Sequence, residues 1–278
     1  MIDLSTFYNK QLEHWPLARE NYEDLATTQE RDMGFDEATV KVQFNPSRIR
    51  SAAADLDEKA LAARPCPLCL ANHPKEQDAI PFDERFSIAV NPYPVFDRHF
   101  TLFCNVHTPQ VLKGNLDTML TMAERLPDYA ILYNGPRCGA SIPDHLHFQA
   151  IPKGLLPVED DWTKYGKIGL RSCHVLDADD KQEMITRFNQ LLEDVFGDTS
   201  GKEEPMMNLV CRYIGQWRLF LFPRKQHRPR QYYATGEEQI LTSPGVIDMA
   251  GVFVFPREED YKKMTKEIIS DIYTQVAL

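Results

Sequence analysis

The sequence predicts an α+β fold in which helices flank an antiparallel sheet. Strand-like segments follow one another in groups, with helical segments between the groups and no regular strand–helix–strand alternation. The order of segments in the second half roughly repeats that of the first, which indicates a degenerate duplication. We expect an N-terminal half, residues 1–160, and a C-terminal half, residues 161–278, either as two units or as one continuous domain.

Composition excludes several classes of protein. With 278 residues, 43% of them apolar, the chain can bury a sizeable core. It has no run of about 18 apolar residues that could cross a bilayer and no basic-then-apolar leader at its start, so we expect a cytoplasmic protein without a membrane partner. A net charge of −10 disfavours nucleic acid as a partner, although a local cluster of cations could still bind a small anion.

The first half begins with a mostly helical segment up to about Asp36, interrupted at Pro16. We interpret it as a packing or dimer-forming element, so a homodimer is a possible assembly. A short alternating strand, 38–46, follows. Residues 64–77 are rich in Pro and Cys and predict a loop. The expected elements beyond that loop are strands at 86–94 and 99–107, a helix at 109–127, and strands at 129–135 and 145–151.

The second half starts with a weakly patterned stretch and a helix at 180–196. Three apolar segments predict strands, and a last helix begins at about Glu258. The predicted strands are 208–214, 217–223 and 246–256.

The segment His145-Leu146-His147-Phe148-Gln149 carries the strongest chemical signal. Strand alternation places His145, His147 and Gln149 on one face. An unprotonated imidazole can attack phosphorus and later leave, and an amide can donate to a phosphate oxygen. The plain alternative is a half-exposed strand with a polar face. The small-residue loop 133–141, which ends at Ser141, favours the phosphate interpretation because its amides could surround a phosphate.

Cys66 and Cys69 have the spacing of a zinc knuckle, in which two thiolates reach one tetrahedral ion. His107 and His145 are plausible further ligands, and His73 is a rival. A redox pair and ordinary core thiols are the alternatives, but the residues after Cys69 leave little room for the helix that lowers a redox thiol pKa.

Two groups of cations are candidates for binding an anion. Arg48 and Arg50 follow the first predicted strand, and a basic run lies between the last two predicted strands. A solvated loop is the alternative for that run, yet in an acidic chain it is the best candidate for an anion pocket. The run contains Arg224, Lys225, His227, Arg228 and Arg230.

Two segments resemble a known superfamily. NPYPVFDRHFTLFCNVH is similar to the strand pair of the histidine-triad proteins, and YNGPRCGASIPDHLHFQ to the Asn…Gly-x-Ser…His-x-His-x-Gln motif of their transferase branch. That branch includes galactose-1-phosphate uridylyltransferase, diadenosine tetraphosphate phosphorylase and the GDP-hexose phosphorylases. The resemblance covers residues 40–155 well and the C-terminal half faintly. It departs at Asp144, an extra residue, and at Leu146, where the uridylyltransferases have Pro.

The resemblance implies a histidine-triad-like sheet and assigns roles to individual residues. His147 would be the nucleophile, Gln149 would hold the transferred phosphate and Ser141 the phosphate beyond it. Asn91 and Asn134 would contact the nucleotide or its α-phosphate. The implied ligands of a structural zinc are Cys66, Cys69, His107 and His145, with no organic cofactor.

The implied activity is that of a nucleotidyltransferase or phosphorylase working through a nucleotidyl-His147 intermediate. Its substrate would be a nucleoside diphosphate sugar or a dinucleoside polyphosphate, and its acceptor inorganic phosphate or a sugar phosphate. The resemblance implies that Gln149, in place of a third histidine, disfavours hydrolysis, in which water would be the acceptor. The alternatives are an enzyme like galactose-1-phosphate uridylyltransferase and a zinc-stabilised nucleotide-binding module without catalysis.

Overall fold

The computed structural model describes residues 3–49, 58–201 and 203–278. Within these ranges no helix combines the length and the apolar character needed to span a bilayer. The strands are β1 Gln29–Phe35, β2 Ala38–Phe44, β3 Ala79–Pro81, β4 Phe86–Val90, β5 Phe100–Cys104, β6 Tyr129–Asn134, β7 His147–Pro152, β8 His174–Ala178, β9 Met207–Tyr213, β10 Trp217–Pro223 and β11 Val252–Phe255. The α-helices are α1 Leu4–His14, α2 Pro16–Asp24, α4 Glu58–Ala63, α5 Leu116–Arg125, α6 Pro157–Tyr165, α7 Lys181–Phe196, α8 Arg230–Tyr233, α9 Val246–Met249, α10 Glu258–Lys263 and α11 Lys266–Val276. The 3₁₀ helices are η1 Leu25–Thr27, η2 Pro46–Arg48, η3 Leu70–Asn72 and η4 Gly236–Glu238.

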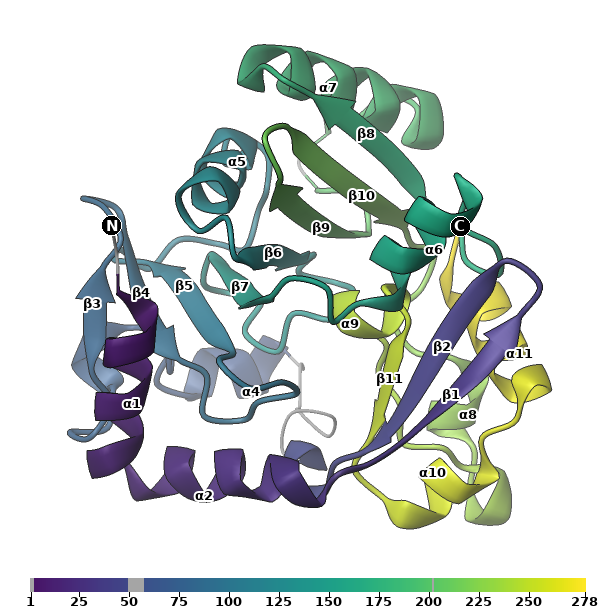
Figure 1. Cartoon of the computed structure of the whole chain (residues 1–278), viewed down its shortest axis with the longest axis horizontal. Coiled ribbons are helices and arrows are strands. Elements are labelled where there is room, and N and C mark those ends of the chain that lie inside the picture. Colours follow the sequence, from purple (N-terminus) through teal and green to yellow (C-terminus); the bar gives the residue numbers. More distant parts are fainter. Residues whose placement is uncertain (1–2, 50–57, 202) are drawn as a thin grey trace.

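The strands form two sheets (Figure 1). The larger is antiparallel throughout and has the order β3-β4-β5-β7-β6-β9-β10-β8. The smaller has the order β1-β2-β11, in which β11 runs parallel to β2. The predicted α+β class with a large antiparallel sheet is therefore confirmed. Because β6 pairs with β9, the two predicted halves share one sheet; their duplication and their boundary at 160/161 stay predictions.

The large sheet separates two hydrophobic cores. Alternation along β6 sends Ile131 and Tyr133 into the first core and Ala130 and Leu132 into the second. Helices α1, α2, α5 and α7 complete the first core, whereas the small sheet and helices α6, α9 and α11 complete the second. The N-terminal helices are thus packing elements of this chain, and the homodimer stays a prediction.

Three segments differ from their predicted structure. The helix expected at 109–127 is limited to α5, Leu116–Arg125. Residues 29–35 form the edge strand β1, whereas the sequence indicated a helix up to Asp36; pairing with β2 across a two-residue turn overrides a weak local pattern, and only Met33 in β1 is buried. Residues 246–249 form the helical turn α9 before β11, because the Asp248 carboxylate accepts a hydrogen bond from the Gly245 N–H and caps the turn.

Candidate active site

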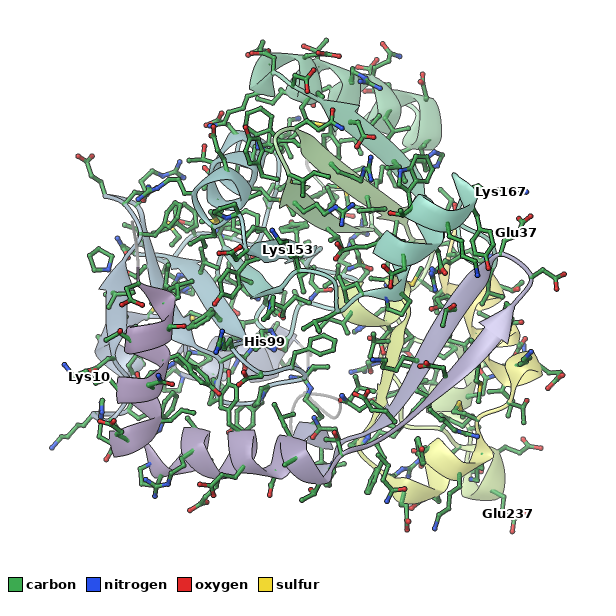
Figure 2. The ribbon with its side chains drawn as sticks, in the orientation of Figure 1. Lys10, Glu37, His99, Lys153, Lys167 and Glu237 are labelled. Atoms are coloured by element: carbon green, nitrogen blue, oxygen red, sulfur yellow. The ribbon has the colours of Figure 1, made fainter. Side chains whose placement is uncertain are left out.

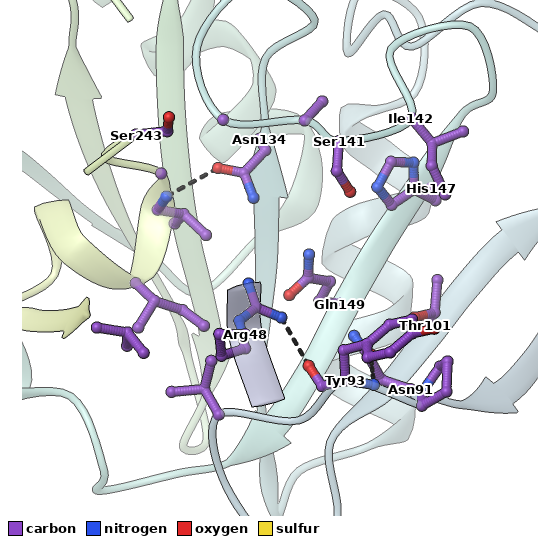
Figure 3. Close-up of a pocket in the computed structure, with 18 of the residues that line it drawn as sticks. Arg48, Asn91, Tyr93, Thr101, Asn134, Ser141, Ile142, His147, Gln149 and Ser243 are labelled. Atoms are coloured by element: carbon purple, nitrogen blue, oxygen red, sulfur yellow. Dashed lines mark hydrogen bonds between the residues drawn. The ribbon is translucent and has the colours of Figure 1, made fainter. Parts of the chain in front are cut away.

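A cavity of about 330 Å³ lies on the sheet face that carries His147 and Gln149. Its walls come from β4, β5, β7, the loop before β7, η2 and two loops of the second half. Figure 3 shows His147, Ser141, Asn134, Gln149 and Arg48 around the same space. The predicted site residues that line it are Arg48, Asn91, Asn134, Ser141, His147, Gln149, His227 and Arg228.

Three predicted substrate-binding residues are placed otherwise. Arg224 is buried behind the cavity wall, and Lys225 is exposed and does not line the cavity. Arg50 lies outside the described residues. The basic run therefore brings only His227 and Arg228 to the cavity.

His147 is the first residue of β7 and is only 5% exposed. Its Nδ1–H donates to the backbone carbonyl of His145 over 2.7 Å, and burial lowers the pKa of the ring to about 4. At neutral pH the ring is therefore uncharged, with its lone pair on Nε2. This is the state in which an imidazole acts as a nucleophile.

Gln110 holds the backbone around His147. This buried side chain accepts the His147 N–H over 2.8 Å and donates to the carbonyls of Asn134 and His147 over 2.9 and 3.0 Å. It thereby joins the end of β6 to the start of β7, where the strand ladder no longer pairs them. Sequence reasoning missed Gln110: it placed this residue within a helix that in fact begins at Leu116, and a single glutamine carries no pattern that indicates burial.

His99 sets the orientation of the Gln149 amide. His99 is 1% exposed, and its Nδ1 accepts the Val95 N–H over 3.3 Å, so in the neutral ring the proton is on Nε2. Burial keeps the ring neutral by lowering its pKa to about 3. Nε2–H then donates to Gln149 Oε1 over 2.8 Å, which leaves the Gln149 NH₂ group as the donor that faces the cavity. Figure 2 shows His99 in the interior of the molecule.

Asn134, at the end of β6, is oriented in the same way. Its Oδ1 accepts the Val246 N–H over 2.8 Å, and a backbone N–H can only donate, so the atom there is the oxygen. The NH₂ group is the part of the amide left to serve the cavity (Figure 3). Two amide donors with no net charge therefore flank the face of the sheet that holds His147.

The loop between β6 and β7 must pass very close to Asn134. A Cβ on Gly139 would lie 2.6 Å from Asn134 Oδ1 and 2.6 Å from the Gly245 Cα, and Gly139 has a φ of +113°. Both facts require glycine. The close approach leads the chain to the exposed Ser141, whose side chain lines the cavity.

The predicted metal ligands lie together beside the cavity. The Sγ atoms of Cys66 and Cys69 and the ring nitrogens of His107 and His145 are all within 4.8 Å of one another. Cys66 Sγ and Cys69 Sγ each lie 3.3 Å from a histidine Nδ1. In a tetrahedron with Zn–S bonds of about 2.3 Å and Zn–N bonds of about 2.0 Å, neighbouring ligand atoms are about 3.3–3.8 Å apart, so this donor set fits a metal of that kind.

Neighbouring groups orient the two histidines of this cluster. His145 Nε2–H donates to the Cys104 carbonyl over 2.7 Å, which leaves Nδ1 free to coordinate, and Asp144 lies 3.9 Å from His107 Nε2. His145 is therefore a member of the Cys/His cluster. Strand alternation does not apply to His145, because β7 begins at His147. The rival ligand His73 packs against Phe103 and is not in the cluster.

Three charged residues, Arg48, Arg228 and Asp248, also line the cavity. Arg48 donates to the Tyr93 carbonyl over 2.6 Å, and burial lowers its pKa to about 10, so it remains a cation at neutral pH. Asp248, which also lines the cavity, has its pKa raised to about 6 by burial. Arg228 donates to Ser243 Oγ over 2.9 Å and lies over the Tyr232 ring.

The family model for a domain of unknown function, DUF4922, matches residues 7–152, which is more than half of the chain. The chain belongs to the DUF4922 family. A second family model, described as the GDPGP1-like C-terminal domain, matches residues 190–278 of this DUF4922 protein. No curated protein sequence matches it.

The fold of this DUF4922 protein is similar to that of yeast Ap4A phosphorylase Apa2. The structure of Apa2 alone superposes with a TM-score of 0.62 at 15% identity, covering 94% of this chain and 97% of Apa2. The structure of Apa2 in complex with Ap4A superposes with a TM-score of 0.64 at 16% identity, covering 100% and 99% of the two chains. These similarities confirm the predicted histidine-triad-like fold.

Proposed function

We propose that this protein is a nucleotidyltransferase or phosphorylase that carries a nucleoside monophosphate on His147. The observation on which the proposal depends is the state of that ring: buried, uncharged, held at Nδ1 by the His145 carbonyl, and placed in a cavity with its Nε2 lone pair available. The substrate is a nucleoside diphosphate sugar or a dinucleoside polyphosphate. Apa2, which has a similar fold, is a phosphorylase with structures in complex with Ap4A and with AMP.

The transfer takes place in two displacements. His147 Nε2 forms a bond to the α-phosphorus while the bond from that phosphorus to the bridging oxygen breaks, and the leaving phosphate takes the electron pair. The imidazolium that results keeps its Nδ1 proton on the His145 carbonyl, so no proton has to move. An oxygen of the acceptor then attacks the same phosphorus, and the P–N bond breaks to restore the neutral ring.

The uncharged donors suit this chemistry. Positioning and charge stabilisation are the main demands of displacement at phosphorus. The NH₂ groups of Gln149 and Asn134 donate to the phosphate oxygens, and Ser141 donates to the phosphate beyond. We assign Asn91 to contacts with the nucleotide, and Arg48, His227 and Arg228, which also line the cavity, to further phosphate groups. The acceptor is inorganic phosphate or a sugar phosphate; the latter would make the enzyme similar to galactose-1-phosphate uridylyltransferase.

We further propose that Cys66, Cys69, His107 and His145 bind a structural zinc ion. Four protein ligands complete a tetrahedron and leave no position for a substrate, which is typical of structural zinc. The ion would hold the loop 64–77 against His145, two residues before the start of β7. The cytoplasmic location stays a prediction.

The test is covalent trapping. The protein is incubated without acceptor with GDP-, UDP- and ADP-linked sugars and with Ap4A, and its intact mass is then measured. We expect an increase equal to one nucleotidyl group, that is, a nucleoside monophosphate less one water, absent from His147→Ala protein and retained in His174→Ala protein, a matched change in β8 away from the cavity. A wild-type protein that binds these nucleotides but never gains mass would support the non-catalytic binding module instead.

A further inference from the structure

A chain of buried hydrogen bonds runs from the second half of the protein to the amide of Asn134. Arg224 Nη1 donates to Asn208 Oδ1, and Asn208 Nδ2 donates to Asn134 Oδ1 over 2.9 Å and to the Cys138 carbonyl over 2.7 Å. Arg224 is 2% exposed and Asn208 is fully buried. None of the three residues is a neighbour of another in sequence.

Arg224 determines which atoms donate and which accept in this series of hydrogen bonds. A guanidinium can only donate, so the Asn208 atom beside it is the oxygen, and the Asn208 NH₂ must point the other way. The Asn134 atom that receives it is then the oxygen, in agreement with the Val246 N–H that reaches the same atom. The amide orientations are thus determined by donors whose identity is unambiguous.

The Arg224 side chain is fixed by hydrogen bonds from all of its guanidinium N–H groups. Its remaining N–H groups donate to the backbone carbonyls of Val276, Pro244, Gln226 and His227. These carbonyls lie at the end of α11 and in the two second-half loops that reach the cavity. The guanidinium therefore links those loops to the Asn134 amide.

We propose that Asn208, held by Arg224, is a positioning residue for the transfer reaction: it fixes Asn134 with its NH₂ group toward the reacting phosphate. The inference rests on the proposed function and gives the C-terminal half a part in it. That half supplies no nucleophile, yet it determines whether Asn134 offers phosphate a donor or a repelling oxygen.

The sharpest variant is Asn208→Asp. A carboxylate has the same shape and still accepts from Arg224, but it can donate neither to Asn134 Oδ1 nor to the Cys138 carbonyl. Two oxygens then face each other, and Asn134 is driven to rotate its NH₂ group away from the cavity. Loss of one donor at a developing oxyanion costs about 10²–10³ in kcat. Because Val246 still favours the original orientation, we expect kcat to fall by roughly 10- to 100-fold, and Tm to fall as well because the Cys138 carbonyl has lost its donor.

The deciding measurement is a double-mutant cycle on the rate of His147 adduct formation and on kcat. If Asn208 acts through Asn134, Asn208→Asp lowers the rate much more in wild-type protein than in Asn134→Ala protein, where only its effect through the Cys138 carbonyl remains. A general structural role would lower both by the same factor, and that result overturns the proposal, as does an unchanged rate in the single variant. Asn189→Asp, the same chemical change on an exposed position of α7, should leave the rate unchanged.

Measurements of nucleotide binding distinguish a failure of this inference from a failure of the proposed function. Calorimetry with GMP and AMP requires no turnover, and Asn208→Asp should weaken binding of the preferred nucleotide only when Asn134 is present. Wild-type protein that neither gains mass nor binds a nucleotide refutes the proposed function and the inference together. Wild-type protein that reacts normally, alongside an Asn208→Asp variant equal to it, refutes the inference alone.

Discussion

Replacing Gln149 by Glu tests the amide arrangement of the site. The shape of the side chain is kept, and an ionised carboxylate still accepts the His99 Nε2–H that now reaches Gln149 Oε1 over 2.8 Å. The oxygen that replaces the NH₂ group cannot donate to phosphate. Loss of one such donor costs about 3–4 kcal/mol. Two charges about 4 Å apart at an effective dielectric constant of 20 add roughly 4 kcal/mol of repulsion.

The sum of these two energies is an upper limit on the increase in the activation free energy, because protonation of the carboxyl group would remove the repulsion. We therefore expect kcat to fall by about 10³-fold or more at pH 8. The loss should shrink toward pH 5.5, where a protonated Glu donates as the amide did. The assay is the rate of adduct formation from pH 5.5 to 8, expressed as the ratio of variant to wild type, so that other titrations cancel. A loss under tenfold, or one that does not vary with pH, would refute the reasoning.

Three further predictions concern stability and metal content. Gly139→Ala should lower Tm and kcat more than Gly114→Ala does, since both change a residue with positive φ but only the Gly139 Cβ meets other atoms; thermal melts and assays of the pair measure the difference. Metal analysis should find about one zinc ion per chain, lost in Cys66→Ser and kept in Cys173→Ser; equal metal in both would exclude the site. Burial lowers the pKa of His99 to about 3, whereas its pKa in the unfolded chain is about 6.5. As the pH falls, the unfolded chain therefore becomes protonated at His99 before the folded protein does. The folded ring therefore costs about 1.4 kcal/mol of stability per pH unit below about 6.5, and denaturant titrations at pH 7, 6 and 5 should show a shallower decline for His99→Gln.

Most of the elements could be predicted from local pattern, since strands such as β5 and helices such as α7 have clear apolar periodicity. The exceptions arise from local signals that apolar periodicity does not carry. The strand β1 pairs with the next strand, β2, across a two-residue turn, and α9 is capped by Asp248, three residues after Gly245. Neither a hairpin turn nor a capping carboxylate changes the apolar pattern on which the prediction depended.

The same limit applies to the site. Residues that belong to short motifs, such as Ser141, His147 and Cys66, could be found from their spacing, although their roles stay predictions. Gln110 and Asn208 could not, because each is an isolated amide whose importance comes from what it joins in space. Arg224 shows the opposite failure: it stands in a basic run that suggested phosphate binding, but its donors all serve the protein.

If His147 is the nucleophile, as proposed, the uncharged donors around it suit a neutral ring. A carboxylate beside His147 would favour its protonation and block attack, and it would repel the phosphate. A cation there would keep the ring neutral but would stabilise bound substrate as well as the transition state, which raises affinity more than rate. Amide donors avoid both costs, provided that they cannot rotate, because a rotated amide presents an oxygen. Hydrogen-bond donors prevent this rotation by holding each amide oxygen away from the cavity. His99 donates to the Gln149 oxygen, and the Val246 N–H and Asn208 donate to the Asn134 oxygen. Under the proposed function, the cations that line the cavity, Arg48 and Arg228, would bind parts of the substrate whose charge does not change during the reaction.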